Sequence, residues 1–196
     1  MPLPPQPAGR KKDKRPLSIN QWGVAGDGTL YVTLGSSDLQ RFDGTDWETL
    51  ERPEGRLGDL HVGADGTLWV RTRVPAVDGF GDVEHVQRLD DGGWTEYDLG
   101  RQSWYPRPEP VVADGAFWYA AEADPMVNGG CDGIARIDDT STMRFLRGQC
   151  VYDIAAGPRG DVWLQAGTWE GNYWLPDAVG PIETYVIPGK AVGANQ

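Results

Sequence analysis

One short phrase occurs four times along the chain, and it constrains the fold more than any other feature of the sequence. An Asp-Gly step between two apolar segments favours a tight turn, because glycine readily adopts the positive φ that such a turn requires. A phrase that returns at a regular spacing also indicates a repeat architecture, in which each copy is one supersecondary unit. The four copies read DGTLYV at 27–32, DGTLWV at 65–70, DGAFWY at 114–119 and RGDVWL at 159–164.

Two further phrases follow each of the first three copies. The first of them places an arginine among apolar residues and ends in aspartate, and the second is a short aromatic or apolar segment. The fourth copy lacks the arginine phrase, and we expect residues 182–187 to form its last strand. The arginine phrases are LQRFD at 39–43, VQRLD at 86–90 and IARID at 134–138, and the final segments are WETL at 47–50, WTEY at 94–97 and MRFL at 143–146.

Each unit of about 40–45 residues therefore contains four short segments rich in β-branched and aromatic residues, a pattern typical of propeller blades. The first strand of each unit is expected to end near Val24, Val62, Val112 or Ala156. The predicted fold class is all-β: a β-propeller with four four-stranded antiparallel blades. It is either a closed four-bladed ring, or a half or fragment of a larger propeller, and the half would pair with a second copy.

The predicted domains are a disordered, proline-rich basic tail or linker at 1–18, the propeller at 19–188 and a C-terminal tail at 189–196. Lys and Arg number 18 and Asp and Glu 29, a net charge of −11, although the basic residues cluster near the N-terminus. An acidic body repels phosphate backbones, so nucleic-acid binding is not expected. No apolar run reaches the roughly 20 residues of a membrane-spanning helix, and no secretory signal is evident at the N-terminus.

The repeats resemble those of known propeller families. DGTLWV and RFDGTDWETL resemble the repeat of two-component-regulator propellers, which form sensor portions of bacterial signalling proteins. GIARIDDTSTMRFL and DIAAGPRGDVWL are similar to repeats of streptogramin-lyase and NHL-type propellers. The resemblance covers about residues 20–188 and implies a propeller fold. It also implies that the chain is the sensor part of a bacterial signalling protein.

Propeller topology places the connections between units, and those between the second and third strands, on one face. The long insertions, about 72–84, 121–133 and 166–172, accumulate there. Rings beside carboxylates and amides are typical of a groove for sugars or peptides. The alternative is that the rings only plug the propeller mouth. The predicted ligand-binding residues on this face are Arg73, Trp104, Glu122, Asp124, Trp169 and Trp174.

The tryptophans fall into two groups. Trp69, Trp118 and Trp163 share one position of the repeat, which Tyr31 occupies in the first unit, so they are expected to pack between blades. Trp104, Trp169 and Trp174 lie outside the repeat, which is why they are assigned to the binding face.

The chain has two cysteines, Cys131 and Cys150, and the topology places both on that same face near one blade boundary. They could form a disulfide if their Cα atoms lie within about 7 Å, and the alternative is a pair of unlinked small apolar side chains. A disulfide would imply an oxidising, extracytoplasmic compartment. Without it, and with Met1 as the native start, the expectation is cytoplasmic.

Signals for catalysis are weak. The two histidines, His61 and His85, have no partner at metal-ligand spacing, and no metal site, cofactor or catalytic residue is predicted. Asp59 and His61 are two apart and face the same way, so they could form a general acid–base dyad, and the alternative is a buried hydrogen-bonded pair. The function expected is therefore a non-enzymatic module that binds a small molecule, glycan, peptide or protein through the loop face. The alternatives are a lyase- or hydrolase-type propeller enzyme that uses a histidine with a carboxylate, and a structural assembly module.

Overall fold

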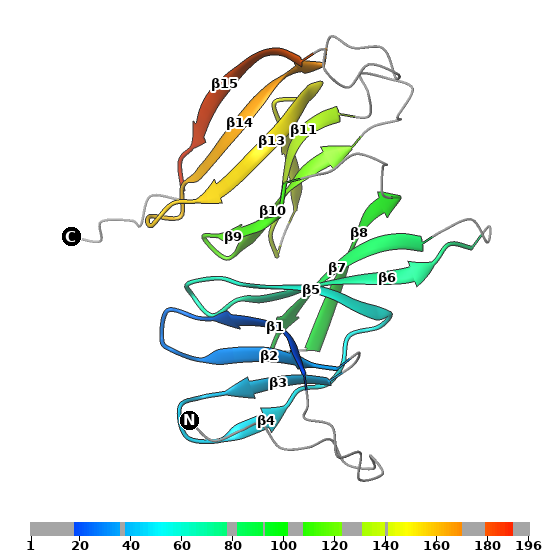
Figure 1. Ribbon diagram of the computed structural model, residues 1–196, viewed down its shortest axis with the longest axis vertical. Helices are drawn as coiled ribbons and strands as arrows, with labels where there is room; N and C mark the ends of the chain where they lie inside the picture. Colours follow the sequence, from blue (N-terminus) through cyan, green and yellow to red (C-terminus); the bar gives the residue numbers. More distant parts are fainter. Residues whose placement is uncertain are drawn as a thin grey trace. The chain divides into compact units, whose positions relative to one another are not determined.

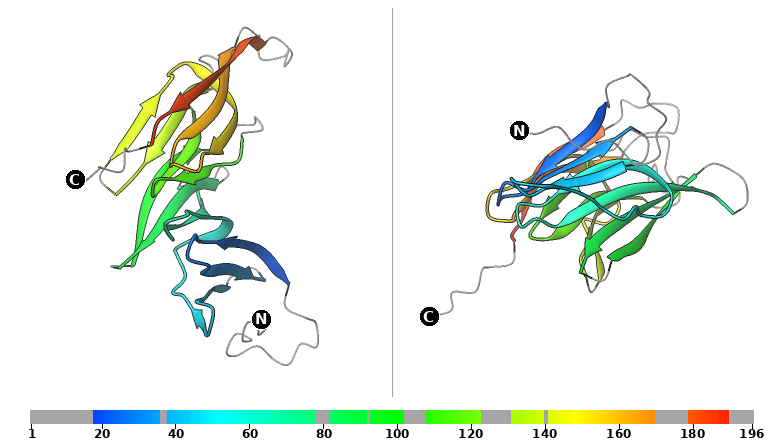
Figure 2. Two further views of the ribbon diagram at one scale, coloured as in Figure 1. Left: turned by 90° about the vertical axis from the view of Figure 1, so that its left-hand side faces the viewer. Right: turned by 90° about the horizontal axis from the view of Figure 1, so that it is seen from below.

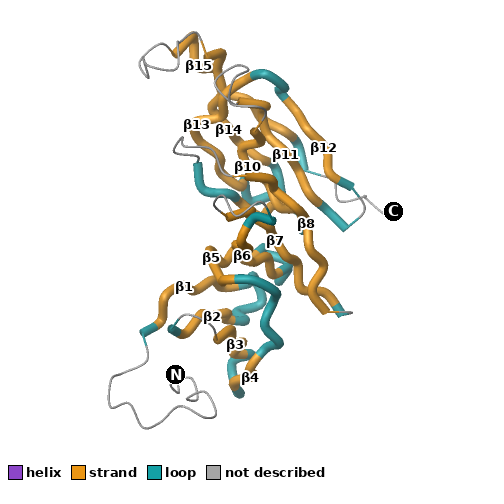
Figure 3. Tube along the Cα trace, turned by 90° about the vertical axis from the view of Figure 1, so that its right-hand side faces the viewer, coloured by secondary structure: helices purple, strands orange, loops and turns teal. Residues whose placement is uncertain are grey.

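The computed structural model describes residues 18–35, 38–77, 82–91, 93–101, 108–122, 131–139, 141–169 and 179–189. Within these ranges every regular element is a β-strand (Figure 3). The described part of the chain contains no helix that is long and apolar enough to cross a membrane. Two compact units make up the chain, Met1–Gln102 and Ser103–Gln196, and each is described by itself. Nearly all of the predicted N-terminal tail and most of the C-terminal tail lie outside the described residues.

The first unit consists of two antiparallel four-stranded sheets whose strands follow each other in chain order (Figure 1). Sheet 1 is built from β1 (Ile19–Val24), β2 (Leu30–Leu34), β3 (Asp38–Phe42) and β4 (Trp47–Thr49). Sheet 2 is built from β5 (Arg56–Val62), β6 (Leu68–Pro75), β7 (Asp82–Asp90) and β8 (Gly93–Arg101).

The second unit also contains two antiparallel sheets. Sheet 3 is built from β9 (Val111–Ala113), β10 (Ala116–Glu122), β11 (Cys131–Ile137) and β12 (Thr142–Phe145). Sheet 4 is built from β13 (Gln149–Ala156), β14 (Val162–Trp169) and β15 (Val179–Ile187).

The prediction of all-β antiparallel sheets in the order of the repeats is confirmed, but sheet 4 differs in detail. As expected, residues 182–187 form the last strand of their sheet, within β15, but this strand pairs directly with β14 (Figures 1 and 2). Because the arginine phrase is missing from this unit, β15 takes the third position in the sheet. Within the described residues, sheet 4 therefore has three strands.

The repeated glycine has the backbone conformation that its turn requires. In sheet 1 the turn is closed by a hydrogen bond from Gly28 N to Ala25 O of 3.0 Å, and Asp27 Oδ1 accepts from Thr29 N at 2.8 Å. A residue with a side chain would be strained in this left-handed region. The φ values are +89° at Gly28, +87° at Gly66, +70° at Gly115 and +77° at Gly160.

The two sheets of each unit pack through one face each. In the first unit Tyr31, Leu39, Leu68 and Val70 form a buried cluster against the apolar residues of β5. In the second unit Trp118 and Ile134 of sheet 3 share a cluster with Ile154, Val162 and Leu164 of sheet 4. The cluster residues within a strand, such as Leu68 and Val70, are two positions apart, because side chains two apart point to the same face of a sheet.

The aromatic residue at the shared repeat position is buried in sheets 1, 2 and 3 but not in sheet 4. Tyr31, Trp69 and Trp118 are 7 %, 0 % and 4 % exposed, but Trp163 is 47 % exposed. Val162 and Leu164, its neighbours in the strand, face sheet 3, so alternation turns Trp163 to the opposite face of sheet 4. The expectation that Trp163 is packed between blades is therefore wrong for the described structure.

Candidate ligand-binding cleft

An open cleft of about 380 Å³ lies in the first unit, between the inner strands of sheets 1 and 2. We call it the sheet 1–2 cleft. The cleft lies at the end of the sheets where β1 and β5 begin and where β2 and β6 finish. The sequence predicted the binding face at this same end. A hydrogen bond of 3.1 Å from Gly35 N to Ser18 O joins these strand ends in sheet 1. The lining residues are Asn20, Gln21, Thr33, Gly35, Arg56, Leu57, Gly58, Asp59 and Arg73.

Two irregularities in the strands shape this cleft. The pairing of β1 with β2 shifts between Ile19 and Gln21, and the pairing of β5 with β6 shifts between Leu57 and Leu60. A β-bulge bends its strand and redirects side chains. Gly58 lies within the second irregularity, where a Cβ atom would come 3.1 Å from the carbonyl oxygen of Arg71. Glycine therefore allows β5 to lie this close to β6.

Asp59 connects the two sheets. Its Oδ1 accepts a hydrogen bond of 2.7 Å from Gln21 Nε2 of sheet 1, and its Oδ2 accepts one of 2.9 Å from Arg71 Nη1 of β6. The amide oxygen of Gln21 in turn accepts from Leu60 N at 2.6 Å. Each oxygen of Asp59 thus has a donor, and Gln21 is fixed at both ends of its amide.

A buried carboxylate lies behind this network. Glu84 on β7 is 2 % exposed, and its Oε1 lies 2.5 Å from Arg71 Nη2 and 3.8 Å from Arg73 Nε. A buried charge is costly unless it is paired. Arg71, whose side chain is 14 % exposed, is consequently held between Asp59 and Glu84, whereas the side chain of Arg73 is 45 % exposed.

Arg56 and Arg73 are Cα partners across the antiparallel pair of β5 and β6. Both side chains line the cleft, and Arg56 is exposed. Like charges placed directly opposite each other destabilise a sheet. The mouth of the cleft therefore carries two arginines that lie opposite each other on neighbouring strands, in a chain whose net charge is −11.

The two histidines are placed differently. Burial lowers the pKa of His61 to about 4, and the nearby Arg71 guanidinium acts in the same direction. His61 is therefore neutral at pH 7. His85 Nδ1 lies 3.0 Å from Glu96 Oε1 on β8. Neither histidine is among the residues that line the cleft. The Asp59 carboxylate that was considered as a partner of His61 bonds to Gln21 and Arg71.

Of the residues predicted to bind ligand, Arg73 lines the cleft. It lies in β6, not in the expected loop, because 73–75 pair with 82–84 and lengthen the hairpin. Glu122 is half-buried at the end of β10, opposite Cys131, and belongs to the second unit. The backbone of Trp169 pairs with Val179 in sheet 4, while its side chain is outside the description. Trp104, Asp124 and Trp174 lie outside the described residues.

Sequence reasoning missed Asn20, Gln21, Thr33 and Arg56 as parts of a site. None of them belongs to the repeat, and the bulges that bring them together have no sequence signature of their own. One signal was available in the Arg-Thr-Arg segment 71–73, which places two arginines on one face at the end of an otherwise apolar strand. Such alternation indicates charged groups that share a surface.

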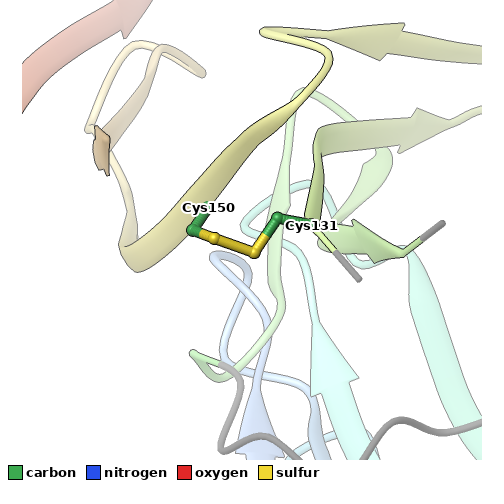
Figure 4. Close-up of a disulfide and its surroundings, with 2 residues drawn as sticks. All are labelled: Cys131 and Cys150. Atoms are coloured by element: carbon green, nitrogen blue, oxygen red, sulfur yellow. A yellow bond between two sulfur atoms is a disulfide. The ribbon is translucent and has the colours of Figure 1, made fainter. Parts of the chain in front are cut away.

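The structure joins Cys131 and Cys150 in a disulfide, with Cα atoms 4.8 Å apart (Figure 4). Cys131 begins β11 and Cys150 lies in β13, so the bond links sheets 3 and 4 within the second unit. These are the two cysteines of the chain. The alternative of two unlinked thiols does not hold in this structure.

Within the described ranges, no group of three or more histidine, cysteine, aspartate or glutamate side chains is close enough to hold a metal ion.

The sequence matches no family model and no curated protein. Among solved structures, the chain is similar to an oligogalacturonate lyase in complex with manganese, with 14% identity and a TM-score of 0.51 over 76% of this chain and 47% of that chain. A protein described as a gluconolactonase has 19% identity and a TM-score of 0.43, over 76% of this chain and 57% of that one. A glucose dehydrogenase has 14% identity and a TM-score of 0.42, over 90% of this chain and 65% of that one.

The chain thus spans about half the length of the lyase. At this identity the likeness concerns the fold alone. Together with the consecutive antiparallel sheets, it shows that the sheets of this chain are blades of the β-propeller type.

Proposed function

We propose that the chain is a non-enzymatic ligand-binding propeller module, and that the sheet 1–2 cleft binds a small polar molecule. The observation that carries this proposal is a solvent-open cleft of about 380 Å³ whose polar walls are already fixed by the bonds among Gln21, Asp59 and Arg71. Binding sites are typically concave and largely preformed, with a few polar groups that set the orientation of the ligand. Fixed walls lower the entropy that is lost on binding.

The ligand would be held by hydrogen bonds and charge. The described lining contains no aromatic side chain, so ring stacking on this part of the surface does not contribute. A small molecule, a sugar unit or the end of a peptide has the right size and polarity. The resemblance of the repeats to two-component-regulator propellers supports a sensor role in a bacterial signalling protein, with this cleft as the input site.

An enzymatic role is less well supported. The oligogalacturonate lyase is an enzyme by name, and this favours the lyase-type alternative. However, an efficient general base has a pKa near the working pH, whereas burial lowers the pKa of His61 to about 4. Asp59, the carboxylate that lines the cleft, already accepts hydrogen bonds from Gln21 and Arg71.

The test is a thermal-shift screen of the whole chain against neutral sugars, sugar acids and dipeptides. A compound that binds the native state stabilises it by RT ln(1 + L/Kd), where L is its free concentration, so the Tm rises with the concentration of the compound relative to its Kd. Asn20→Trp places a bulky ring in the cleft, and Asn20→Ala removes the same side-chain bond to Gly35 O without filling the space. We expect Asn20→Trp to weaken binding at least tenfold more than Asn20→Ala does.

Two results would contradict the proposal: no compound in the screen raises the Tm, or Asn20→Trp binds as well as Asn20→Ala. NMR analysis of the bound compound after a long incubation checks the non-enzymatic part. Unchanged compound supports a binding module, and conversion to a product would transfer the site to the enzyme class.

A second role, self-association, is favoured by a separate observation. Trp22 and Val24 of β1 are 68 % and 50 % exposed on the face of sheet 1 that points away from sheet 2. Trp163 and Val186 are each 47 % exposed on the face of sheet 4 that points away from sheet 3. In both described sheet pairs, an aromatic residue at the Trp163 position, Tyr31 or Trp118, packs on the inner strand of the next sheet.

We infer that Trp163 of one copy packs on Trp22 and Val24 of a second copy. Light scattering at increasing protein concentration is expected to show a mass above that of the 21.5 kDa chain, and Trp22→Ser should lower this mass. A mass that stays at one chain up to high micromolar concentration would reject self-association.

A further inference from the structure

The charges around the sheet 1–2 cleft point to one class of ligand. Three arginines, Arg56, Arg71 and Arg73, lie in or directly behind the cleft, together with the carboxylates of Asp59 and Glu84. Arg71 contacts both carboxylates. The local balance is therefore one formal positive charge, and it belongs to Arg56 and Arg73 at the mouth. This excess is found in a chain of net charge −11.

The arrangement of these two arginines carries the argument. Arg56 and Arg73 are directly opposite each other on β5 and β6, and both line the cleft. Such a pair costs stability when the two charges have the same sign. Arg73 approaches Glu84 only through Nε, at 3.8 Å, which is longer than a hydrogen bond. An anion between the two guanidinium groups would remove their repulsion and accept hydrogen bonds from both.

The floor of the cleft does not compete for this role. Asp59 has a donor on each oxygen, and the amide of Gln21 is engaged at both its nitrogen and its oxygen. These groups therefore give the cleft its shape, and they leave little capacity to bind a cation. Arginine presents a planar fork of donors that matches a carboxylate in two parallel hydrogen bonds.

We propose that Arg56 and Arg73 together bind the carboxylate of a small ligand in the sheet 1–2 cleft. This inference rests on the proposed function and specifies its ligand class. A single negative charge balances the local excess of one, whereas a phosphate dianion would exceed it. The carboxylate could belong to a sugar acid or to the end of a peptide, since both present the same group to the two arginines.

The experiment is isothermal titration calorimetry on the whole chain with two matched pairs of probes. Glucuronate is compared with glucose, and N-acetylglycine with N-acetylglycinamide, so that each pair differs in the carboxylate and represents one source. At low ionic strength we expect the acid of at least one pair to bind at least tenfold more tightly than its neutral partner. The pair that shows the preference identifies the source. The preference should weaken as salt is added, because ions screen the interaction.

Three variants locate the effect. Arg56→Gln and Arg73→Gln should each reduce the affinity for the acid about tenfold and reduce the affinity for the neutral partner much less. Arg73→Lys retains the charge but not the fork of donors. The affinity of this variant for the acid should therefore lie between those of the wild type and Arg73→Gln. Arg41→Gln is the matched control, because it removes one arginine from sheet 1 that does not line the cleft and should not change either affinity.

The outcomes separate the two proposals. If the neutral and acidic members bind equally and Asn20→Trp blocks both, the carboxylate inference is wrong and the proposed function stands. Tighter binding of inorganic phosphate than of either acid would overturn the choice of carboxylate. Equal loss of affinity in Arg41→Gln and Arg73→Gln would show a general charge effect and reject the two-arginine site. If no probe binds the wild-type chain although a compound of the thermal-shift screen does, this inference is wrong and the proposed function stands; if neither the probes nor the screened compounds bind, both are wrong.

Discussion

The guanidinium carbon of Arg88 lies 5.8 Å from the centre of the Trp69 ring, and the two residues are Cα partners on β7 and β6. Arg136 and Trp118 have the same relationship in sheet 3, also at 5.8 Å. In sheet 1, Arg41 is the partner of Tyr31. The arginine phrase and the aromatic phrase of the sequence repeat therefore describe two sides of one contact, in which a cation is held over a ring.

We predict that Arg88→Met, which keeps the apolar stem, lowers the free energy of unfolding by about 1 kcal/mol, because a partly desolvated cation–π contact is lost. Arg41→Met in the same unit should cost no more than about 0.5 kcal/mol, since the side chain of Arg41 is 43 % exposed and pairs with Glu48 at the surface. Urea denaturation of both variants measures the difference. Equal losses would contradict a specific contribution from the buried ring.

The tryptophan at the shared repeat position should contribute more to the free energy of unfolding in sheet 3 than in sheet 4. Trp118→Ala should destabilise the second unit by about 3–5 kcal/mol, because it leaves a cavity in a buried cluster. Trp163→Ala should cost less than about 1.5 kcal/mol, since half of that side chain already contacts water. Thermal or chemical denaturation of the two variants tests this, and a loss at Trp163 as large as that at Trp118 would show that this face is covered in solution.

Reduction of the Cys131–Cys150 disulfide should destabilise the second unit by about 3 kcal/mol, because the bond closes a loop of 19 residues in sequence separation. Denaturation with and without reductant measures the effect, and a Cys131→Ala/Cys150→Ala double variant serves as the control that no longer responds to reductant. Mass spectrometry after alkylation of the unreduced chain should find no blocked thiol. Two blocked thiols per chain would contradict the disulfide.

His61 should make stability depend on pH. Its pKa is about 4 when folded and near 6.5 when unfolded, so between these values the unfolded chain binds more protons. The stability that the neutral imidazole provides is complete above pH 6.5 and is lost as pH falls toward 4, by about 3 kcal/mol at pH 4. His61→Gln should show a flatter curve by that amount in urea denaturation. Parallel curves for the variant and the wild type would contradict a buried neutral His61.

The sequence predicted the sheets well because their determinants are local. The repeated glycine has positive φ in every unit, and β-branched and aromatic residues flank it, so each turn and its strands could be located. The exposure of Trp163 could not be predicted in this way. Its local sequence follows the same repeat pattern as that of Trp69 and Trp118, whereas its exposure depends on which sheet packs on that side, which the local sequence does not encode.

The cleft lies at the end of the sheets where a site was expected from the sequence, but few of its lining residues were among those expected. Arg73 was named because it was assigned to the long insertion 72–84, whereas the positions of Gln21 and Arg56 depend on how two strands far apart in sequence approach each other. Gln21 bonds to Leu60 and Asp59, and neither contact leaves a pattern in either strand. Contacts of this kind follow from bulges and sheet packing, which a repeat phrase does not encode.

Amide chemical-shift mapping with glucuronate tests the central claim most directly. If the sheet 1–2 cleft is the binding site, the largest changes in a ¹⁵N–¹H spectrum occur at Arg56, Gly58 and Arg73, and they saturate with one affinity. The turns at Gly28 and Gly66, at the opposite end of the same sheets, stay unchanged. Changes centred on those turns, or an unchanged spectrum at saturating ligand, would contradict the assignment of this cleft as the ligand site.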